Sequence, residues 1–580
     1  MLQDRRLGTS LASASVRRMV KCVGDFDLWR LEGNFSRARV LNEQTLRKIL
    51  SDNRQTWFGR RAGFAELLRA PDLLAAYRAQ LPVATYADFA EPIQRMVAGE
   101  ANVLCAEPPI SFAASSGTTG AAKLLPVTRA QQRQGMAFMA ATNHAAALRA
   151  LAPREPLRKG ICLLQISAAA PTTRDGLPIA LGSSLGMRRM LPMLEKMWSA
   201  PVEVYEISDT PTSNYLQALF GLRERQTQYI TATFASIVLQ WLLALQSRWD
   251  ELLTDIAQGS LSENLHLTPA EREKLSVGLV PDPARAAELR QAVAGGFEGF
   301  LERVWPQMRY ISTVTTGSFA VYLPQLQSLA GSVVLYSCYY GASEAAFGMS
   351  LWPERPGEYA LAAGDCYYEF IPTSQMESTT PQTVSLADLV PGELYEFVIT
   401  TRAGLYRYRI GDVIEVTGWH GAAPRFRFSY RRETMLDVSG EKMTEAQIRQ
   451  ALVEVGLFEP DSLIRLRDYS CAVEAKSLPH RYVFYLELVT TPPDLDLASL
   501  ANHLDQRLSA LNNLYRSYRA RNTLGAPLIK LVHPATFDRF LELQLSLNPQ
   551  SNTNQVKIPR YVKDAQRLAF LENMTSLAGQ

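Results

Sequence analysis

Between residues 160 and 336, short apolar runs alternate with long helical patterns. The strand-like runs cover residues 160–166, 202–207, 308–314 and 331–336, and the clearest helices cover 234–257 and 282–304. Strands that alternate with helices build units in which neighbouring strands run parallel and the helices cover the sheet. The sequence therefore predicts an α/β fold with a substantially parallel sheet.

The chain divides into two parts near residue 430. Its 580 residues are more than one hydrophobic core usually organises. Strand patterns fill residues 392–417, and beyond residue 431 follow a helix after Thr444, a strand at 482–489 and a helix at 497–515. We expect a large N-terminal domain at residues 1–430 and a smaller α+β domain at residues 431–580.

Composition excludes several classes of protein. The 60 lysines and arginines nearly balance the 57 aspartates and glutamates, so no overall charge recruits nucleic acid or an anionic membrane. The six cysteines form no CxxC pair, and the six histidines have no metal-like spacing. The longest apolar stretch, residues 230–245, is interrupted by polar residues and is predicted to be a buried helix, not a membrane span.

The N-terminal residues carry arginines and serines, which are typical of transit peptides. Asp4 and the lack of a continuous apolar core argue against that interpretation. A cytoplasmic location is therefore expected.

A loop of small residues is the sharpest local feature. It joins two probable strands at 110–114 and 123–127, and it consists of Ser115, Ser116, Gly117, Thr118, Thr119 and Gly120. Glycine amides, hydroxyl groups and the nearby Lys123 suit the oxygens of a polyphosphate. The spacing is not that of a Walker A loop. From composition alone, a phosphate loop and a Ser/Thr-rich hairpin turn fit this segment equally well.

Three further segments carry candidate side chains. Tyr340 can stack on a purine, and Glu344 can reach a magnesium ion beside phosphates. Asp412 follows Gly411 and can accept two ribose hydroxyls at a bend, and Lys557 lies between polar residues and a proline. Taken singly, each segment fits a structural role better, as a core strand ending in a turn, a strand with a turn aspartate, or a solvated loop.

Arginine is dense around the Asp412 segment. Strand alternation places Arg407 and Arg409 on one face, and the complete set is Arg402, Arg407, Arg409, Arg425, Arg427, Arg431 and Arg432. This density indicates either an exposed strand face or a surface that helps to neutralise a nucleotide.

A competing motif, GxSxG at residues 182–186, is typical of the nucleophile elbow of serine hydrolases. The elbow needs a strand that runs straight into the turn and a helix that leaves it. Residues 175–178 break that approach, and five-residue patterns of this kind are frequent accidents. A hydrolase is therefore kept only as a minor alternative.

In order and spacing, these features resemble the acyl-acid amido synthetases of the auxin-responsive Gretchen Hagen (GH3) family, within the adenylating superfamily of acyl-CoA synthetases and luciferases. The resemblance runs nearly end to end. The matching segments include residues 56–60, 115–120, 316–318, 340–344, 368–372, 392–396, 404–412, 440–442 and 554–560. Ala342, Ala345 and Ala346 depart from the family pattern beside the acyl pocket, so the acid preference is what they place in doubt.

The resemblance implies an N-terminal adenylating domain with mixed β-sheets and flanking helices, followed by a mobile C-terminal domain. It implies that ATP and Mg²⁺ are bound, with the 115–120 loop and Lys123 around the β- and γ-phosphates. The remaining implied roles are adenine contact for Tyr340 and Gly341, magnesium binding for Glu344, ribose binding for Asp412, assistance at the hinge for Arg431, and contact with the carboxylate and α-phosphate for Lys557.

The expected function is ATP-dependent activation of a small carboxylic acid as an acyl-AMP, followed by transfer of the acyl group to an amine or amino acid. An acyl-CoA ligase is the main alternative because it shares the first step, and a non-catalytic nucleotide-binding protein is a minor one. The sequence leaves open the acid, the amine and the oligomeric state.

Overall fold

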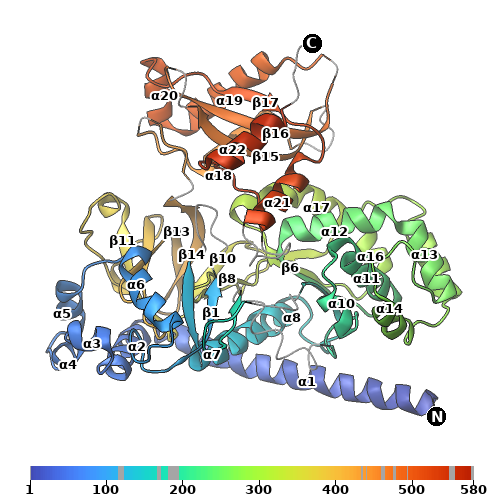
Figure 1. Cartoon of the computed structure of the whole chain (residues 1–580), viewed down its shortest axis with the longest axis horizontal. Helices are drawn as coiled ribbons and strands as arrows, with labels where there is room; N and C mark the ends of the chain where they lie inside the picture. Colours follow the sequence, from blue (N-terminus) through green and yellow to red (C-terminus); the bar gives the residue numbers. More distant parts are fainter. Residues whose placement is uncertain are drawn as a thin grey trace.

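The structure is a computed structural model. It describes residues 2–114, 123–165, 171–180, 195–432, 435–438, 440–458, 464–474, 478–492, 494–547 and 556–575. Three groups of elements fill separate regions: the helix-covered parallel sheet, the large antiparallel sheet with the N-terminal helices, and the C-terminal elements above both (Figure 1).

A four-stranded parallel sheet lies at the centre of the first region. Its order is β3-β5-β6-β7, with bounds Gly160–Leu163, Tyr229–Phe234, Tyr310–Val314 and Val334–Tyr336. The helices around it are α10 (Val202–Glu206), α11 (Thr210–Arg223), α12 (Ala235–Ser247), α13 (Trp249–Gln258), α14 (Pro269–Ser276), α15 (Pro283–Ala292), α16 (Phe300–Val304) and α17 (Leu323–Ala330). The expected α/β fold with a parallel sheet is confirmed.

Several local predictions in this region are wrong. The expected helix at 282–304 is two helices, α15 and α16, separated by residues 293–299, and the expected helix at 234–257 is broken at Arg248 between α12 and α13. Residues 202–206 form a short helix directly after Pro201, and the neighbouring side chains of Val204 and Tyr205 are both buried, as a strand with one covered face would not allow. The apolar run 230–245 is not one helix, because its first residues belong to the buried parallel strand β5. A continuous apolar run does not distinguish a buried strand from a buried helix.

A seven-stranded sheet, antiparallel throughout, forms the second region. Its order is β11-β12-β13-β14-β10-β9-β8, with bounds Cys366–Pro372, Leu394–Thr401, Tyr408–His420, Ala423–Arg431, Glu358–Leu361, Ala346–Met349 and Tyr339–Gly341. The ring of Tyr340 on β8 contacts Phe397 on β12 and Phe426 on β14. The sheet therefore curls around an aromatic core.

A small sheet and the N-terminal helices complete this part of the chain. The sheet has the order β2-β1-β4, with bounds Leu124–Thr128, Pro109–Ala114 and Ile179–Ala180. The helices are α1 (Leu2–Phe35), α2 (Ala38–Asn53), α3 (Trp57–Arg61), α4 (Phe64–Leu67), α5 (Leu73–Gln80), α6 (Tyr86–Val97), α7 (Arg129–Ala140) and α8 (Ala147–Leu151). The two strands predicted on either side of the 115–120 loop are present as β1 and β2, which pair antiparallel. The Thr85 N–H donates to Asp88 at the start of α6.

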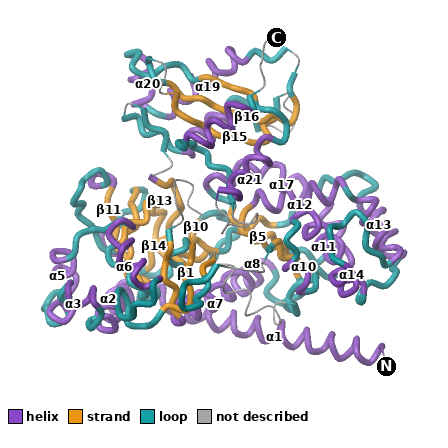
Figure 2. The backbone as a smooth tube through the Cα atoms, in the orientation of Figure 1, coloured by secondary structure: helices purple, strands orange, loops and turns teal. Residues whose placement is uncertain are grey.

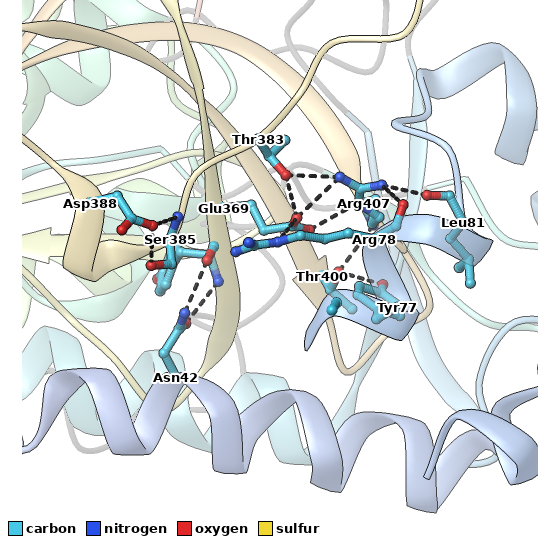
Figure 3. A network of polar contacts seen from close by, with 12 residues as sticks. Asn42, Tyr77, Arg78, Leu81, Glu369, Thr383, Ser385, Asp388, Thr400 and Arg407 are labelled. Atoms are coloured by element: carbon cyan, nitrogen blue, oxygen red, sulfur yellow. Dashed lines mark hydrogen bonds and ion pairs between the residues drawn. The ribbon is translucent and has the colours of Figure 1, made fainter. Parts of the chain in front are cut away.

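A buried ion network ties the N-terminal helices to the antiparallel sheet (Figure 3). The Glu369 carboxylate on β11 accepts hydrogen bonds from Arg407 and from Arg78 on α5, at 3.0–3.1 Å. Thr383 adds a third donor at 2.7 Å, and the Glu369 side chain is fully buried. Arg407 itself has a positive φ of 47°, a strained conformation for a residue with a side chain.

Four of the arginines around Asp412 form ion pairs with carboxylates of the antiparallel sheet. Arg407 pairs with Glu369 and Arg409 pairs with Glu396, both buried carboxylates. Arg425 and Arg427 pair with Glu358. These contacts hold strands of the sheet together. Arg407 is buried and the Arg409 side chain is only 14% exposed, so the interpretation as an exposed strand face is wrong for them, whereas the Arg427 side chain is 48% exposed.

The C-terminal elements build a separate α+β layer with cores of its own (Figure 2). The sheet order is β15-β16-β17, with bounds Arg465–Glu474, Arg481–Thr490 and Leu528–Leu531. The helices are α18 (Glu445–Glu454), α19 (Leu497–Leu511), α20 (Asn513–Ala520), α21 (Thr536–Leu547) and α22 (Ala565–Asn573). The predicted helix at 497–515 is interrupted at Asn512, whose side chain caps α20.

No helix in the described part of the chain is both long enough and apolar enough to cross a lipid bilayer.

A π-helical turn, Ala141–Ala146, lies between α7 and α8 and places His144 against the parallel sheet. The Tyr310 hydroxyl donates to the Asn143 carbonyl at 2.8 Å, so the Nδ1–H of His144 is the donor in the 3.2 Å contact with that hydroxyl. Burial lowers the pKa of His144 to about 4. The folded protein therefore holds this imidazole neutral.

His144 is expected to weaken the fold in mild acid. Its folded pKa of about 4 lies below the ordinary value of 6.5. The stabilisation is therefore complete above the unfolded pKa and is lost as pH falls toward the folded pKa. Lowering the pH from about 7 to about 5 is therefore expected to reduce the free energy of unfolding by about 1–2 kcal/mol.

Urea denaturation at both pH values should show a smaller loss of unfolding free energy for His144→Gln than for the wild type. The same substitution at His266, which is 82% exposed, should leave the wild-type loss unchanged, and an equal loss in all three proteins would contradict the assignment.

Candidate functional site

Asp412 lies at a bulge in β13. The register between β12 and β13 shifts after Glu396, and Gly411 has a φ of 84°, which favours glycine. Across the sheet Asp412 faces Arg431, the last residue of β14. The predicted bend at this aspartate is therefore present in the structure.

Two neighbours hold the Asp412 carboxylate. Arg431 donates to one oxygen at 2.5 Å, and the Tyr340 hydroxyl donates to the other. The negative charge of Asp412 raises the pKa of Arg431, and burial together with Asp412 raises the pKa of Tyr340. Three of the residues predicted from sequence are thus in direct contact.

Tyr340 reaches this carboxylate from a pocket of aromatic rings. Its ring contacts are with Phe347, Tyr359, Phe397, Phe426 and Phe428. The neighbouring Gly341 ends β8 close to the backbone of Ala345, where a Cβ would lie 3.2 Å from the carbonyl oxygen. The segment is therefore both a core strand and the support of the carboxylate.

Glu344 follows β8 and faces the same charges. Burial raises the pKa of its carboxyl group, the positive charges of Arg431 and Lys123 lower it, and Asp412 raises it. Among the described residues, no side chain donates a hydrogen bond to the Glu344 carboxylate. Magnesium is usually held by one or two carboxylates together with phosphate oxygens and water, and the Glu344 carboxylate is a group of that kind.

Lys123 closes the β1–β2 hairpin beside Glu344. The Tyr86 hydroxyl donates to the Leu124 carbonyl at 3.2 Å and accepts from its N–H at 2.9 Å, and the Lys123 ammonium lies 5.7 Å from the Tyr86 ring centroid. The described pairing of the two strands ends at Ala114 and Leu124. The predicted loop residues Ser115, Ser116, Gly117, Thr118, Thr119 and Gly120 lie outside the described residues.

Lys557 comes to this place from the C-terminal part of the chain. Burial lowers the pKa of its ammonium, and the nearby charge of Arg431 lowers it further, whereas Glu445 and Asp412 raise it. Lys557 also lines a small, partly open cavity with residues of α12, of the 3-10 helix Gly317–Tyr322, and with Leu541 and Arg560. The structure therefore brings Lys557 toward the Asp412–Arg431 pair.

Several residues of this region were not predicted from sequence. The Tyr86 hydroxyl accepts from the Leu124 N–H at the start of β2, and the Gln131 amide donates to the Glu344 carbonyl at 2.8 Å. The charge of Glu445 raises the pKa of Lys557. None of them stands in a motif with its own chemical signature. The GxSxG residues 182–186 lie outside the described residues.

Comparison with protein families covers most of the chain. The GH3 family N-terminal domain matches residues 28–335, the central domain residues 359–431, and the C-terminal domain residues 446–566. The N-terminal model spans the parallel sheet and most of the N-terminal helices, the central model spans most of the antiparallel sheet, and the last model spans most of the C-terminal elements.

Individual relatives are similar over nearly their whole length. Indole-3-acetic acid-amido synthetase GH3.3 of Arabidopsis thaliana is 30% identical over 92% of this chain and 91% of its own. Indole-3-acetic acid-amido synthetase GH3.8 of Oryza sativa subsp. indica is 31% identical over 92% and 91%. The solved structure of the GH3.15 acyl acid amido synthetase has a TM-score of 0.82 and 28% identity, covering 94% of this chain and 95% of that one.

The fold and these relatives define an acyl-acid amido synthetase, a ligase that forms a carbon–nitrogen bond. The α/β architecture with several sheets, expected from the sequence, is that of the matched structure. The chain belongs to the GH3 family.

Proposed function

We propose that the protein uses ATP to convert a small carboxylic acid to an acyl-AMP and then passes the acyl group to an amine or amino acid. One observation carries this proposal: the buried Lys557 ammonium of the C-terminal part is under the influence of the charges of Arg431 and Asp412, which form an ion pair on the large sheet. Glu344 and Lys123 border the same place. Opposite charges gathered at one point suit a nucleotide that carries a sugar, phosphates and a metal ion.

In the first step a carboxylate oxygen of the acid attacks the α-phosphorus of ATP. The bond from that phosphorus to the bridging oxygen breaks, and pyrophosphate leaves with the electron pair. Negative charge shifts onto the phosphates, so positive groups placed beforehand lower the barrier. Lys557 would approach the carboxylate and the α-phosphate, and Lys123 with the 115–120 loop would hold the β- and γ-phosphates.

The second step forms the amide. The amine nitrogen attacks the acyl carbon, the bond from that carbon to the AMP oxygen breaks, and the nitrogen loses a proton. AMP is a far better leaving group than the oxide of a free carboxylate, which explains why the acid is first activated. No covalent bond to the enzyme is required.

The remaining residues would bind and orient ATP. Asp412 would accept the ribose hydroxyls, with Arg431 beside it, and Tyr340 and Gly341 would lie against adenine. Glu344 would hold Mg²⁺, and the ion, when bound, supplies charge neutralisation at the phosphates. Neighbouring aromatic rings hold the Tyr340 ring in place, and its hydroxyl contacts Asp412. Tyr340 would therefore connect the adenine-binding side of the site to the ribose-binding side.

We further propose the domain division at residues 1–430 and 431–580, with a C-terminal domain that moves between the two steps. The cores of the two parts are built from separate sets of residues. Lys557 occupies the site of the first step, and an amine must reach the acyl carbon in the second. Withdrawal of Lys557 with its domain would clear that path.

The proposal is tested by measuring products with a panel of aromatic, indolic and aliphatic acids. An accepted acid should drive exchange of labelled pyrophosphate into ATP, and with the right amino acid, mass spectrometry should detect an amide together with AMP. Without acid, exchange should be absent. A thioester formed with coenzyme A and no amide would identify an acyl-CoA ligase instead. Ester hydrolysis without ATP, or ATP binding without exchange for any acid, would refute the adenylation chemistry.

A further inference from the structure

Tyr322 connects the two parts of the chain at a buried point. It is the last residue of the 3-10 helix Gly317–Tyr322, which follows strand β6. Its hydroxyl donates to Asp468 on β15 at 2.6 Å and accepts from the Arg560 guanidinium at 3.0 Å. One phenol oxygen thus contacts both members of an ion pair that belongs to the C-terminal part.

The ion pair is enclosed. The Asp468 and Arg560 side chains are 7% and 3% exposed, and the guanidinium also donates to the Tyr469 carbonyl at 2.6 Å. Burial and the charge of Asp468 raise the pKa of Tyr322, so its hydroxyl keeps its proton and remains a donor. Hydrogen bonds from a neutral hydroxyl to a buried charge are stronger than bonds between neutral groups.

Arg560 lies three residues beyond Lys557, on a segment that is held along β15. Ser470 donates to the Pro559 carbonyl at 2.7 Å, the Cys471 N–H donates to the Arg560 carbonyl at 2.8 Å, and the Val562 N–H donates back to Cys471 at 2.8 Å. The segment therefore continues the edge of the C-terminal sheet. Whatever fixes the position of Arg560 also fixes the position of Lys557.

Tyr322 and Lys557 also face the same space. Tyr322, Lys557 and Arg560 line the same small cavity together with Phe319 and residues at the start of α12. Tyr322 therefore makes its hydroxyl contact at the wall of a cavity that Lys557 also lines.

We propose that Tyr322 is a positioning residue for the adenylation step. Its hydroxyl binds the Asp468–Arg560 pair and thereby holds the Lys557 segment against the N-terminal domain. The inference rests on the proposed function of Lys557. It assigns to Tyr322 no contact with a reacting atom.

The test compares two substitutions that each remove one phenol oxygen beside Arg560. Tyr322→Phe removes the hydroxyl that joins the two parts. Tyr469→Phe is the matched control, because the Tyr469 ring packs against Arg560 at 4.5 Å and its buried hydroxyl has no hydrogen-bond partner among the described residues. Both variants keep their aromatic ring, so packing is conserved.

Tyr322→Phe is expected to lower kcat for acid-dependent ATP–pyrophosphate exchange by about 10- to 100-fold, the effect of one hydrogen bond to charged groups. The KM for ATP and the rate of amide formation from synthetic acyl-AMP should change little. Tyr469→Phe should resemble the wild type in all three quantities. Hydrogen–deuterium exchange of the peptide that holds residues 556–562 should be faster in Tyr322→Phe than in Tyr469→Phe.

The possible results separate the inference from the proposed function. If the wild type itself shows no exchange with any acid, the proposed function fails. If the wild type exchanges but Tyr322→Phe behaves like Tyr469→Phe, the positioning role alone is wrong. Equal losses in exchange and in amide formation would show that Tyr322 only supports the fold, and would also overturn the inference.

Discussion

Lys557→Ala is expected to slow acid-dependent exchange of pyrophosphate into ATP by about 10²- to 10³-fold, the usual loss when one preorganised charge-stabilising donor is removed. The charges of Asp412 and Arg431 act on the Lys557 ammonium, and we propose that its positive charge faces the α-phosphate as negative charge builds up. Amide formation from synthetic acyl-AMP does not require that charge, and its rate should fall far less. Rapid measurement of both half-reactions on one preparation gives the comparison.

Lys563→Ala supplies the matched control for this variant. Lys563 lies on the same C-terminal segment, but it is exposed and its ammonium lies over the ring of Tyr561. Its replacement removes the same charge from the domain without touching the site, so exchange should stay near the wild-type rate. Equal loss of both half-reactions in Lys557→Ala would remove this lysine from the role proposed for it.

Glu369→Gln is expected to destabilise the fold by about 3–5 kcal/mol, because an ion pair broken from one side leaves buried charge without compensation. The side chain is fully buried between Arg407 and Arg78, and an amide of the same shape presents one acceptor where the carboxylate presents two. Thermal unfolding should begin several degrees lower. The effect should also reach the site, since Arg407 stands just before β13, the strand that carries Asp412.

Asp52→Asn makes the same chemical change in an exposed ion pair. Asp52 and Lys48 are 50% and 58% exposed on α2, and their contact measures 3.1 Å. Exposed pairs contribute about 0–1 kcal/mol, so this variant should melt with the wild type. Similar melting of Glu369→Gln and Asp52→Asn would mean that the network in Figure 3 does not hold the sheet to the helices.

The parts of the fold that follow from local pattern were predictable from sequence. Alternation of strands and helices indicated the parallel sheet, and Thr444 correctly marked the start of α18. The errors arose where local pattern does not decide the structure. Val202 and Val204 alternate as in a strand, yet the segment is too short for a pattern to be reliable, and it forms a helix next to Pro201. The 230–245 run is apolar because β5 is covered on both faces.

The candidate site was predictable where a residue belongs to a recognisable segment. Tyr340, Asp412 and Arg431 lie together, although nothing in their separate segments indicates that they touch. Arg407 and Arg409 could not be assigned, because their carboxylate partners lie on other strands. Tyr322 stands 146 residues before Asp468 and 238 before Arg560, so only the folded chain shows that the three meet.

The backbone bonds between residues 559–562 and β15 restrict how the ammonium group of Lys557 can travel. A lysine on a free tail could swing out alone within nanoseconds and leave the nucleotide exposed to water. Under the proposed domain motion the Lys557 segment moves together with the C-terminal sheet, so we expect its withdrawal to follow the slower time scale of domain motion. An acyl-AMP would then stay shielded from water until the motion that also admits the acceptor.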